Sequence, residues 1–255
     1  MKTIVVGDLH LQGTHILPLI DKVIAQHKIE RVVLLGDYFD QWGQNFNSNL
    51  YEREVAYLKS WVLKHREQGL AVILLIGNHD APYLLGLLRH YSISDASIVN
   101  LIKETLLELG VQLCIEVEDY LISHAGFAGK QLPEKWYFEP MTLEKFEALN
   151  KLENTVGYVR GGRDSVGSLL WADYKYELTT GFNEKYAKQI VGHTPVSKGM
   201  ASGQLWGMDT FSLYQDYRPI GNGDVLLIEN GTASIIATDF VDEHEALRQA
   251  DKLFK

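Results

Sequence analysis

The chain has 255 residues, 46% of them apolar and 22% charged, which is typical of a globular protein with a sizeable core. Its formal net charge of -9 argues against long nucleic acids as partners, although bound divalent cations would reverse the charge locally. The single cysteine, Cys114, excludes an intrachain disulfide. The N-terminus turns polar too early for a signal peptide, and no apolar run could span a bilayer. We therefore expect a cytoplasmic protein without membrane partners.

The first part of the chain alternates short apolar runs with longer amphipathic stretches. The runs predict strands at Thr3–Val6, Arg31–Leu35 and Leu70–Ile76, and the stretches between them predict helices at Ile16–His27 and Leu50–Gln68. A β-α-β-α-β order of this kind is typical of a parallel sheet.

Two further helices are predicted at Tyr83–His90 and Ser97–Leu109, after which the predicted strands come closer together. These strands are Val111–Val117, Tyr120–Ser123, Gln189–Val191, Gln204–Met208, Asp224–Glu229 and Ala233–Thr238. Their spacing, and the turn signal at Glu229-Asn230-Gly231-Thr232, indicate a largely antiparallel second part.

Residues 130–188 give a weaker pattern, with one predicted helix at Leu143–Lys151 and much loop. A surface helix is predicted at Glu243–Phe254. Because the chain contains no repeat and no linker-like segment, we expect a single domain over residues 1–255.

Five of the predicted strands run into side chains that can bind a metal, often with a glycine at the turn. The five segments are Gly7-Asp8-Leu9-His10, Gly36-Asp37-Tyr38-Phe39-Asp40, Gly77-Asn78-His79-Asp80, His124-Ala125-Gly126 and Gly192-His193-Thr194-Pro195. Each segment alone is weak evidence, since a lone histidine or aspartate is more often structural. In an open α/β sheet, however, ligands bind beyond the carboxyl ends of the strands, so the five can converge on one point.

The residue types in these segments indicate the chemistry. Carboxylate, imidazole and amide oxygen together suit a divalent ion such as Mn, Fe, Zn or Co. A carboxylate can bridge two such ions, and ions about 3.5–4 Å apart can clamp an in-line displacement at phosphorus. The pattern therefore predicts a phosphoesterase with two metal ions.

Taken in order, the five segments resemble the pattern of the calcineurin-like metallophosphoesterases, and the resemblance spans Gly7–Thr194. The branch that includes phosphoprotein phosphatases and diadenosine-tetraphosphate hydrolases is the most similar one. Three segments support that branch: Gly192-His193-Thr194-Pro195, Leu169-Leu170-Trp171-Ala172-Asp173 and Gly207-Met208-Asp209-Thr210. The resemblance implies an α/β (α+β) fold, a four-layer α-β-β-α sandwich of two mixed sheets flanked by helices.

The resemblance also implies roles for individual residues. Asp8 and His10 would bind the first metal and Asp37 would bridge both ions. Asn78, His124 and His193 would bind the second. His79 would be the general acid, held in place by Asp40. Manganese is the expected ion, with Fe, Zn, Co and Ni left open.

Substrate binding is the point at which the chain departs from that branch. An arginine that grips the phosphate usually follows the position of Asp40, whereas here Gln41 stands there, able to donate a hydrogen bond but uncharged. Arg160 and Arg163, in a segment with glycines, are the candidate cations for the phosphate. The alternative is that this segment is a solvated surface loop.

The expected activity is hydrolysis of phosphomonoesters, on a small molecule or a phosphoprotein, by in-line attack of a hydroxide that bridges the metals. A phosphodiesterase or dinucleoside polyphosphate hydrolase is the alternative, favoured by the missing arginine because a diester carries less charge. A non-catalytic binding module is a third hypothesis. It predicts lost ligands, whereas all of the expected ligands are present.

Overall fold

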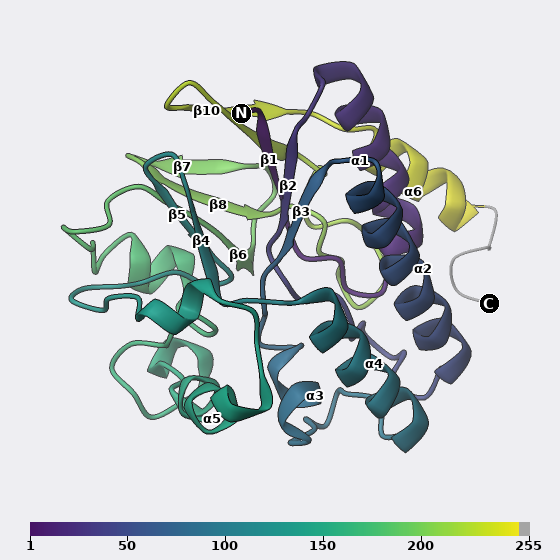
Figure 1. The fold of residues 1–255 in the computed structure, drawn as a ribbon, viewed down its shortest axis with the longest axis horizontal. Coiled ribbons are helices and arrows are strands. Elements are labelled where there is room, and N and C mark those ends of the chain that lie inside the picture. Colours follow the sequence, from purple (N-terminus) through teal and green to yellow (C-terminus); the bar gives the residue numbers. More distant parts are fainter. Residues whose placement is uncertain (250–255) are drawn as a thin grey trace.

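Two five-stranded sheets face each other in the computed structural model, which describes residues 1–249. Their strand orders are β10-β9-β1-β2-β3 and β4-β5-β6-β8-β7, and each sheet contains parallel and antiparallel neighbours. In Figure 1, α1, α2 and α6 lie beside the first sheet, and α5 lies below the second. The architecture is the expected sandwich of two mixed sheets flanked by helices.

The first sheet contains the three parallel strands predicted at the start of the chain, joined by the last two strands of the chain. Its strands are β1 (Thr3–Val6), β2 (Arg31–Leu34), β3 (Ala71–Leu74), β9 (Val225–Glu229) and β10 (Thr232–Ile236). Strands β1, β2 and β3 run parallel, and α1 (Gly13–His27) and α2 (Ser48–Glu67) connect them. The β-α-β-α-β prediction is therefore confirmed, and so is the antiparallel hairpin of β9 and β10.

The second sheet differs from prediction at three strands, one of which, predicted at Val111–Val117, begins only at Cys114. It consists of β4 (Cys114–Val117), β5 (Tyr120–Ser123), β6 (Gln189–Pro195), β7 (Met200–Ser202) and β8 (Leu205–Asp209). Strand β7 was not predicted, because its three residues are all exposed and show no alternation. Strand β6 continues past the predicted end at Val191 to Pro195, with a register shift against β8 that falls across His193.

The remaining helices are α3 (Ala81–Leu85), α4 (Ala96–Leu109), α5 (Phe146–Asn154) and α6 (Phe240–Gln249). The predicted helix Tyr83–His90 is wrong beyond Leu85, because Gly86 adopts a φ of 69° and ends α3 there. The predicted helix Leu143–Lys151 forms as a short 3-10 turn at Leu143–Lys145 followed by α5. Of the predicted helix Glu243–Phe254, residues 250–254 lie outside the described residues.

Short irregular elements fill the segment for which the sequence pattern was weak. They are the 3-10 turns Lys135–Phe138 and Tyr158–Arg160 and the π-helical turn Tyr174–Leu178. Among residues 1–249, no helix is both long enough and apolar enough to cross a bilayer.

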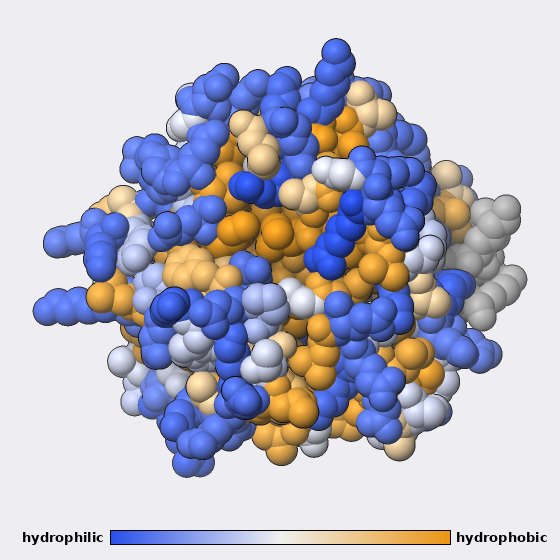
Figure 2. Space-filling view, viewed as in Figure 1, coloured by the Kyte–Doolittle hydropathy of each residue, from blue (hydrophilic) through white to orange (hydrophobic). Residues whose placement is uncertain are grey.

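Strands β1 and β2 bury both of their faces, which explains why their sequences are continuously apolar rather than alternating. Val5 and Val33 pack into the core between the sheets, whereas Ile4 and Val32 pack into the core under the helices. All four side chains are completely buried. With both faces covered, the first sheet is a rigid support for the loops that follow its strands. On the face of the molecule shown in Figure 2, hydrophobic residues gather in the middle and hydrophilic residues surround them.

Candidate metal centre

The six predicted metal ligands come together at the carboxyl ends of the strands. Asp8 and His10 follow β1, Asp37 follows β2 and Asn78 follows β3. His124 follows β5 and His193 lies in β6, so both sheets contribute. All six residues are buried except His10, which is partly exposed. The site therefore combines segments that are far apart in the sequence.

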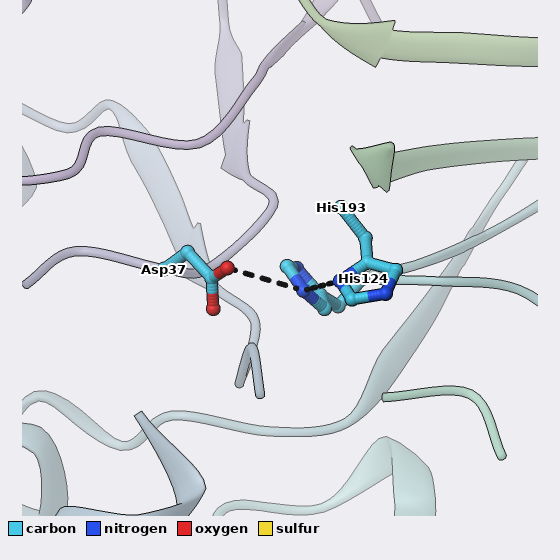
Figure 3. Close-up of side chains that lie close together, drawn as sticks. All are labelled: Asp37, His124 and His193. Carbon is cyan, nitrogen blue, oxygen red and sulfur yellow. Dashed lines mark hydrogen bonds and ion pairs between the residues drawn. The ribbon is translucent and has the colours of Figure 1, made fainter. Parts of the chain in front are cut away.

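One group of ligand atoms forms around His124. Its Nε2 lies 2.9 Å from Asn78 Oδ1, 3.2 Å from His193 Nδ1 and 3.5 Å from Asp37 Oδ2. The Asn78 Oδ1 to His193 Nδ1 distance is 2.7 Å. Figure 3 shows Asp37 and His193 on opposite sides of the His124 ring. Carboxylate, amide and imidazole atoms thus converge on one point.

A second group shares the same aspartate. One ligand atom each of Asp8, His10 and Asp37 lie within 4.8 Å of one another, and the same holds for Asp37, His124 and His193. His10 Nε2 is 3.9 Å from Asp37 Oδ2. Asp37 therefore belongs to both groups and stands between them.

Two of the glycines predicted at strand ends are explained by this crowding. A Cβ atom on Gly77 would lie 2.0 Å from Asp37 Oδ1, and one on Gly192 would lie 2.2 Å from Asp8 Oδ1. Any side chain at either position would displace a candidate ligand. The glycines are needed for the close approach of the two carboxylates.

The backbone of the centre is strained. Asp37, Asp40, His10 and His193 all adopt positive φ angles, between 43° and 69°. Residues other than glycine rarely adopt this conformation, and it persists only where the surrounding structure enforces it. This backbone conformation helps to direct the side chains of the four residues toward the same small region.

Hydrogen bonds hold two of the imidazoles in orientations suited to a metal. His124 Nδ1 lies 2.8 Å from the Leu35 carbonyl oxygen and His10 Nδ1 lies 3.0 Å from that of Asp40. A proton on each Nδ1 satisfies these bonds and leaves Nε2 with a lone pair. The free nitrogens face the group of ligand atoms.

The polar atoms of the centre fit divalent cations. Asp8 Oδ1 and His193 Nε2 are buried and have no hydrogen-bond partner among the described residues. Burial, followed by the charges of Asp209 and Asp37, raises the pKa of Asp8 well above its ordinary value. Burial, followed by Arg160 and His124, lowers the pKa of His193, which keeps the imidazole in the neutral form that binds metals. A cation would offset the cost of burying these carboxylates together.

His79 and Asp40 form a pair at the edge of the centre. His79 Nδ1 lies 3.2 Å from Asp40 Oδ2, and the His79 ring contacts those of His10 and Tyr91, with centroid distances of 5.1 Å and 4.5 Å. Burial alone would lower the pKa of His79, but Asp37 and the hydrogen bond to Asp40 outweigh it and raise this pKa to about 9. Because Nδ1 is turned to Asp40, Nε2 is left for a substrate.

Asp40 is itself held by three hydroxyl groups that the sequence analysis did not identify. Tyr51 and Tyr83 donate to its Oδ1, and Ser92 donates to its Oδ2 at 3.2 Å. Their sequence signal is faint, because a tyrosine or serine on a predicted helix or loop has many structural roles. Only the fold shows that they share one acceptor.

Asp80 also has a role that the sequence did not reveal. Its Oδ2 accepts the backbone N–H groups of Asp37 and Gly77, at 2.7 Å and 2.9 Å, and its Oδ1 accepts that of Tyr38 at 3.1 Å. The carboxylate therefore ties the loop after β2 to the loop after β3. Both loops carry candidate ligands.

A cavity of about 360 Å³ adjoins the centre, and two of the three predicted substrate-binding residues line it. Arg160 pairs with Asp173 at 3.0 Å and donates to Thr194 Oγ1 at 2.7 Å, while its buried Nε has no partner among the described residues. Gln41 also lines the cavity with a buried Nε2 that lacks a partner in the described part of the chain. Arg163 is exposed and does not line the cavity.

Comparison with known proteins identifies related sequences and folds. The profile of a family described as calcineurin-like phosphoesterase matches residues 1–236. A cold-active protein-tyrosine phosphatase of a psychrophilic Shewanella species has a similar structure, with a TM-score of 0.55 and 19% identity over 94% of this chain and 78% of that chain. A phosphoesterase from E. coli matches with a TM-score of 0.37 and 14% identity, over 93% of this chain and 98% of that chain. The similarity to the Shewanella structure shows that the two proteins share a fold. No curated protein sequence matches the chain.

Proposed function

The chain belongs to the calcineurin-like phosphoesterase family, and we propose that it hydrolyses phosphate monoesters at a centre of two divalent metal ions. The observation that carries the proposal is the position of Asp37, which belongs to two groups of metal-capable side chains. Asp8 and His10 would hold the first ion with Asp37. Asn78, His124 and His193 would hold the second ion with the same carboxylate.

The ligand atoms also suggest the identity of the ions. Mixed imidazole, carboxylate and amide ligands suit manganese, and they also suit Fe, Zn, Co or Ni. When bound, two such ions supply electrostatic stabilisation of the phosphoryl group and a nucleophile at neutral pH.

His79 is the proposed general acid. Its Nδ1 is turned to Asp40, so Nε2 is the nitrogen that a substrate in the cavity can reach. As the bond between phosphorus and the leaving oxygen breaks, the proton on Nε2 passes to that oxygen and leaves a neutral imidazole. Asp40 positions the ring throughout, because three hydroxyl groups fix its own carboxylate.

Arg160 and Gln41 are the proposed phosphate-binding residues. Among the described residues, Arg160 is the only lysine or arginine that lines the cavity, and its Nε has a hydrogen to donate. Its pairing with Asp173 fixes the guanidinium in place before substrate arrives. Gln41 adds a neutral donor at the position where the related branch has a cation. Arg163 enters the proposal only if its loop moves toward the cavity.

One observation favours a diester or dinucleoside polyphosphate as the substrate instead. Gln41 provides no charge, so Arg160 alone faces a phosphate that carries up to two negative charges in a monoester. A diester carries one charge and needs less compensation.

Parallel hydrolysis of p-nitrophenyl phosphate and bis-p-nitrophenyl phosphate with added Mn²⁺ tests the proposal. We expect faster cleavage of the monoester, and loss of activity in Asp37→Asn and in wild-type protein with chelator. Glu147→Gln, which alters an exposed glutamate, is the control and should remain active. Faster cleavage of the diester would replace the monoester proposal, and no cleavage with any divalent ion would overturn both.

A further inference from the structure

The cavity next to the metal centre has two chemically different ends. His10, Asp37, Asn78, His193 and Arg160 line its polar end. Trp42, Leu213 and Ile220 line the part that adjoins a second cavity, since these three residues line both cavities, and we refer to this part as the apolar end. A ligand that fills the whole cavity must therefore combine a phosphoryl group with an apolar group.

Trp42 is unusually exposed for a tryptophan beside a buried centre, with 54% of its surface accessible. A ligand that covers the exposed ring would gain from burying its apolar area. The ring also borders a second cavity, of about 530 Å³, which shares Leu213 and Ile220 with the first. One side of the apolar end is thus open to a group larger than phosphate.

The position of Trp42 is fixed by a hairpin from a distant part of the chain. Residues 212–220 form this hairpin, in which Leu213 bridges to Pro219 and the Ile220 N–H donates to the Ser212 carbonyl oxygen. Tyr217 Oη donates to the Trp42 carbonyl oxygen at 2.9 Å, and Gln44 Nε2 donates to the same hydroxyl at 2.9 Å. These bonds hold the backbone at Trp42 in place, which reduces the movement that binding has to suppress.

The charges around the apolar end restrict what it can accept. Among the described residues that line the two cavities, the cationic side chains other than histidine are Arg160 and Arg218. Arg218 lines only the second cavity, where its Nε donates to Asp216 Oδ2 at 2.6 Å and the carboxylate lies beside the cation. A leaving group with further phosphates would therefore find no lysine or arginine at the apolar end of the first cavity, among the described residues, and a cation paired with a carboxylate in the second. The apolar end thus disfavours an anionic occupant.

We propose that the substrate is a phosphate monoester whose leaving group carries an uncharged planar aromatic ring that stacks on Trp42 between Leu213 and Ile220. The inference rests on the proposed function, because the phosphoryl group is assigned to the metal centre. A flat ring suits this end because a tryptophan face favours stacking over contact with a flexible chain. Trp42 is then a specificity-determining residue and takes no part in the chemistry.

Binding of phosphonates tests this inference without hydrolysis. Methylphosphonate, phenylphosphonate and cyclohexylphosphonate are titrated calorimetrically into Mn²⁺-loaded wild-type protein, Trp42→Ala, Trp42→Phe and Phe46→Ala. Phe46 lies in the same loop, is 87% exposed and lines neither cavity, so Phe46→Ala is the matched control. We expect the wild type to bind phenylphosphonate about tenfold more tightly than methylphosphonate.

The variants separate the ring from the rest of the site. In Trp42→Ala the preference for phenylphosphonate should disappear while the affinity for methylphosphonate stays the same. Trp42→Phe should keep part of the preference and Phe46→Ala all of it. Equal binding of all three phosphonates, an unchanged preference in Trp42→Ala, or no binding of any phosphonate would overturn the inference. If cyclohexylphosphonate binds as tightly as phenylphosphonate, the claim of a planar ring is wrong.

The two proposals fail in different ways. If the protein hydrolyses monoesters but shows no preference among the phosphonates, only the inference about the leaving group is wrong. If it shows the preference but hydrolyses no ester, the proposed function is wrong and the binding site remains.

Discussion

At the scale of single residues, the proposed catalysis depends most on how His79 is held. Its ring is held by the hydrogen bond to Asp40 and by contacts with the rings of His10 and Tyr91. This arrangement meets the requirement for a general acid, namely a proton donor with one free nitrogen in a defined position.

His79→Asn removes the proton donor and keeps a polar side chain of smaller size. We expect kcat to fall by roughly 10²–10⁴-fold for alkyl phosphates, and by much less for p-nitrophenyl phosphate, because a good leaving group needs little protonation. Metal content should not change. A loss of equal size for both classes of ester would contradict the role of His79 as general acid.

Tyr83→Phe removes one of the donors to the buried Asp40 carboxylate. The variant loses one hydrogen bond to a charged group and leaves the Ile93 N–H, which donates to the Tyr83 hydroxyl, without that acceptor. Because a hydrogen bond to a charged group contributes about 1.5–3 kcal/mol, urea denaturation should show a loss of stability in that range. The side chain of Tyr83 is fully buried, and a phenylalanine in its place keeps the packing of the ring, so the variant isolates the contribution of the hydroxyl. No change in the free energy of unfolding would mean that Asp40 does not depend on this bond.

At the scale of elements, the strand ends position the centre through two glycines. Gly192→Ala places a Cβ atom against Asp8, so we expect at least a tenfold loss of metal affinity, measured calorimetrically. Gly203→Ala is the control, because a Cβ there meets no atom within 4 Å and only its positive φ is strained. It should lower stability by about 1 kcal/mol without affecting metal binding. Equal metal affinity in the two variants would contradict the explanation of Gly192.

Helix α1 carries a histidine that gives the stability a pH dependence. Burial, followed by Arg53 and His244, lowers the pKa of His15 to about 4. Because the pKa of His15 is lowered in the folded state, the unfolded chain binds the proton more readily. The stability that depends on neutral His15 is therefore fully present above pH 6.5 and is lost as the pH falls toward 4. The loss should be about 2 kcal/mol, allowing for partial exposure of the ring.

His15→Gln should reduce that loss of stability between pH 7 and pH 4 in urea denaturation experiments. His90→Gln, which changes an exposed histidine, is the control. If both variants keep the full pH dependence of the wild type, His15 is not its source.

The elements also show how far the sequence could predict the structure. The three parallel strands and two helices at the start were predictable because each is long or strongly apolar and both faces are covered. Strand β7 was not, because an exposed edge strand pairs through its backbone and leaves no side-chain pattern. The end of α3 depends on the conformation of Gly86, and a glycine can also occur inside a helix.

The site was predictable to the extent that its chemistry lies in short motifs. The six candidate ligands are brought together because each lies near the end of a strand. The donors to Asp40 and the hairpin behind Trp42 could not be predicted, because they depend on contacts between segments 11 to 175 residues apart. Arg160 and Arg163 are close neighbours in the sequence, yet only Arg160 lines the cavity.

At the scale of the whole molecule, removal of metal should affect folding as well as activity. The centre joins loops from both sheets, and it buries several carboxylates that repel one another. Mn²⁺ at about 100 times its dissociation constant would stabilise the fold by about 2.7 kcal/mol per site. For a chain of this size, Tm should fall by roughly 5–10 °C for each site that a chelator empties. An unchanged Tm would show that the folded state does not bind the ion more tightly than the unfolded chain.

The number of metal ions per chain tests the central claim most directly. Protein loaded with Mn²⁺ and passed through a desalting column is analysed by elemental mass spectrometry, for wild type, Asp37→Asn and Glu147→Gln. We expect two ions per chain in wild type and in Glu147→Gln, and less than one in Asp37→Asn, because both ions would share that carboxylate. One ion or none in the wild type, or two ions in Asp37→Asn, would contradict a centre built around Asp37.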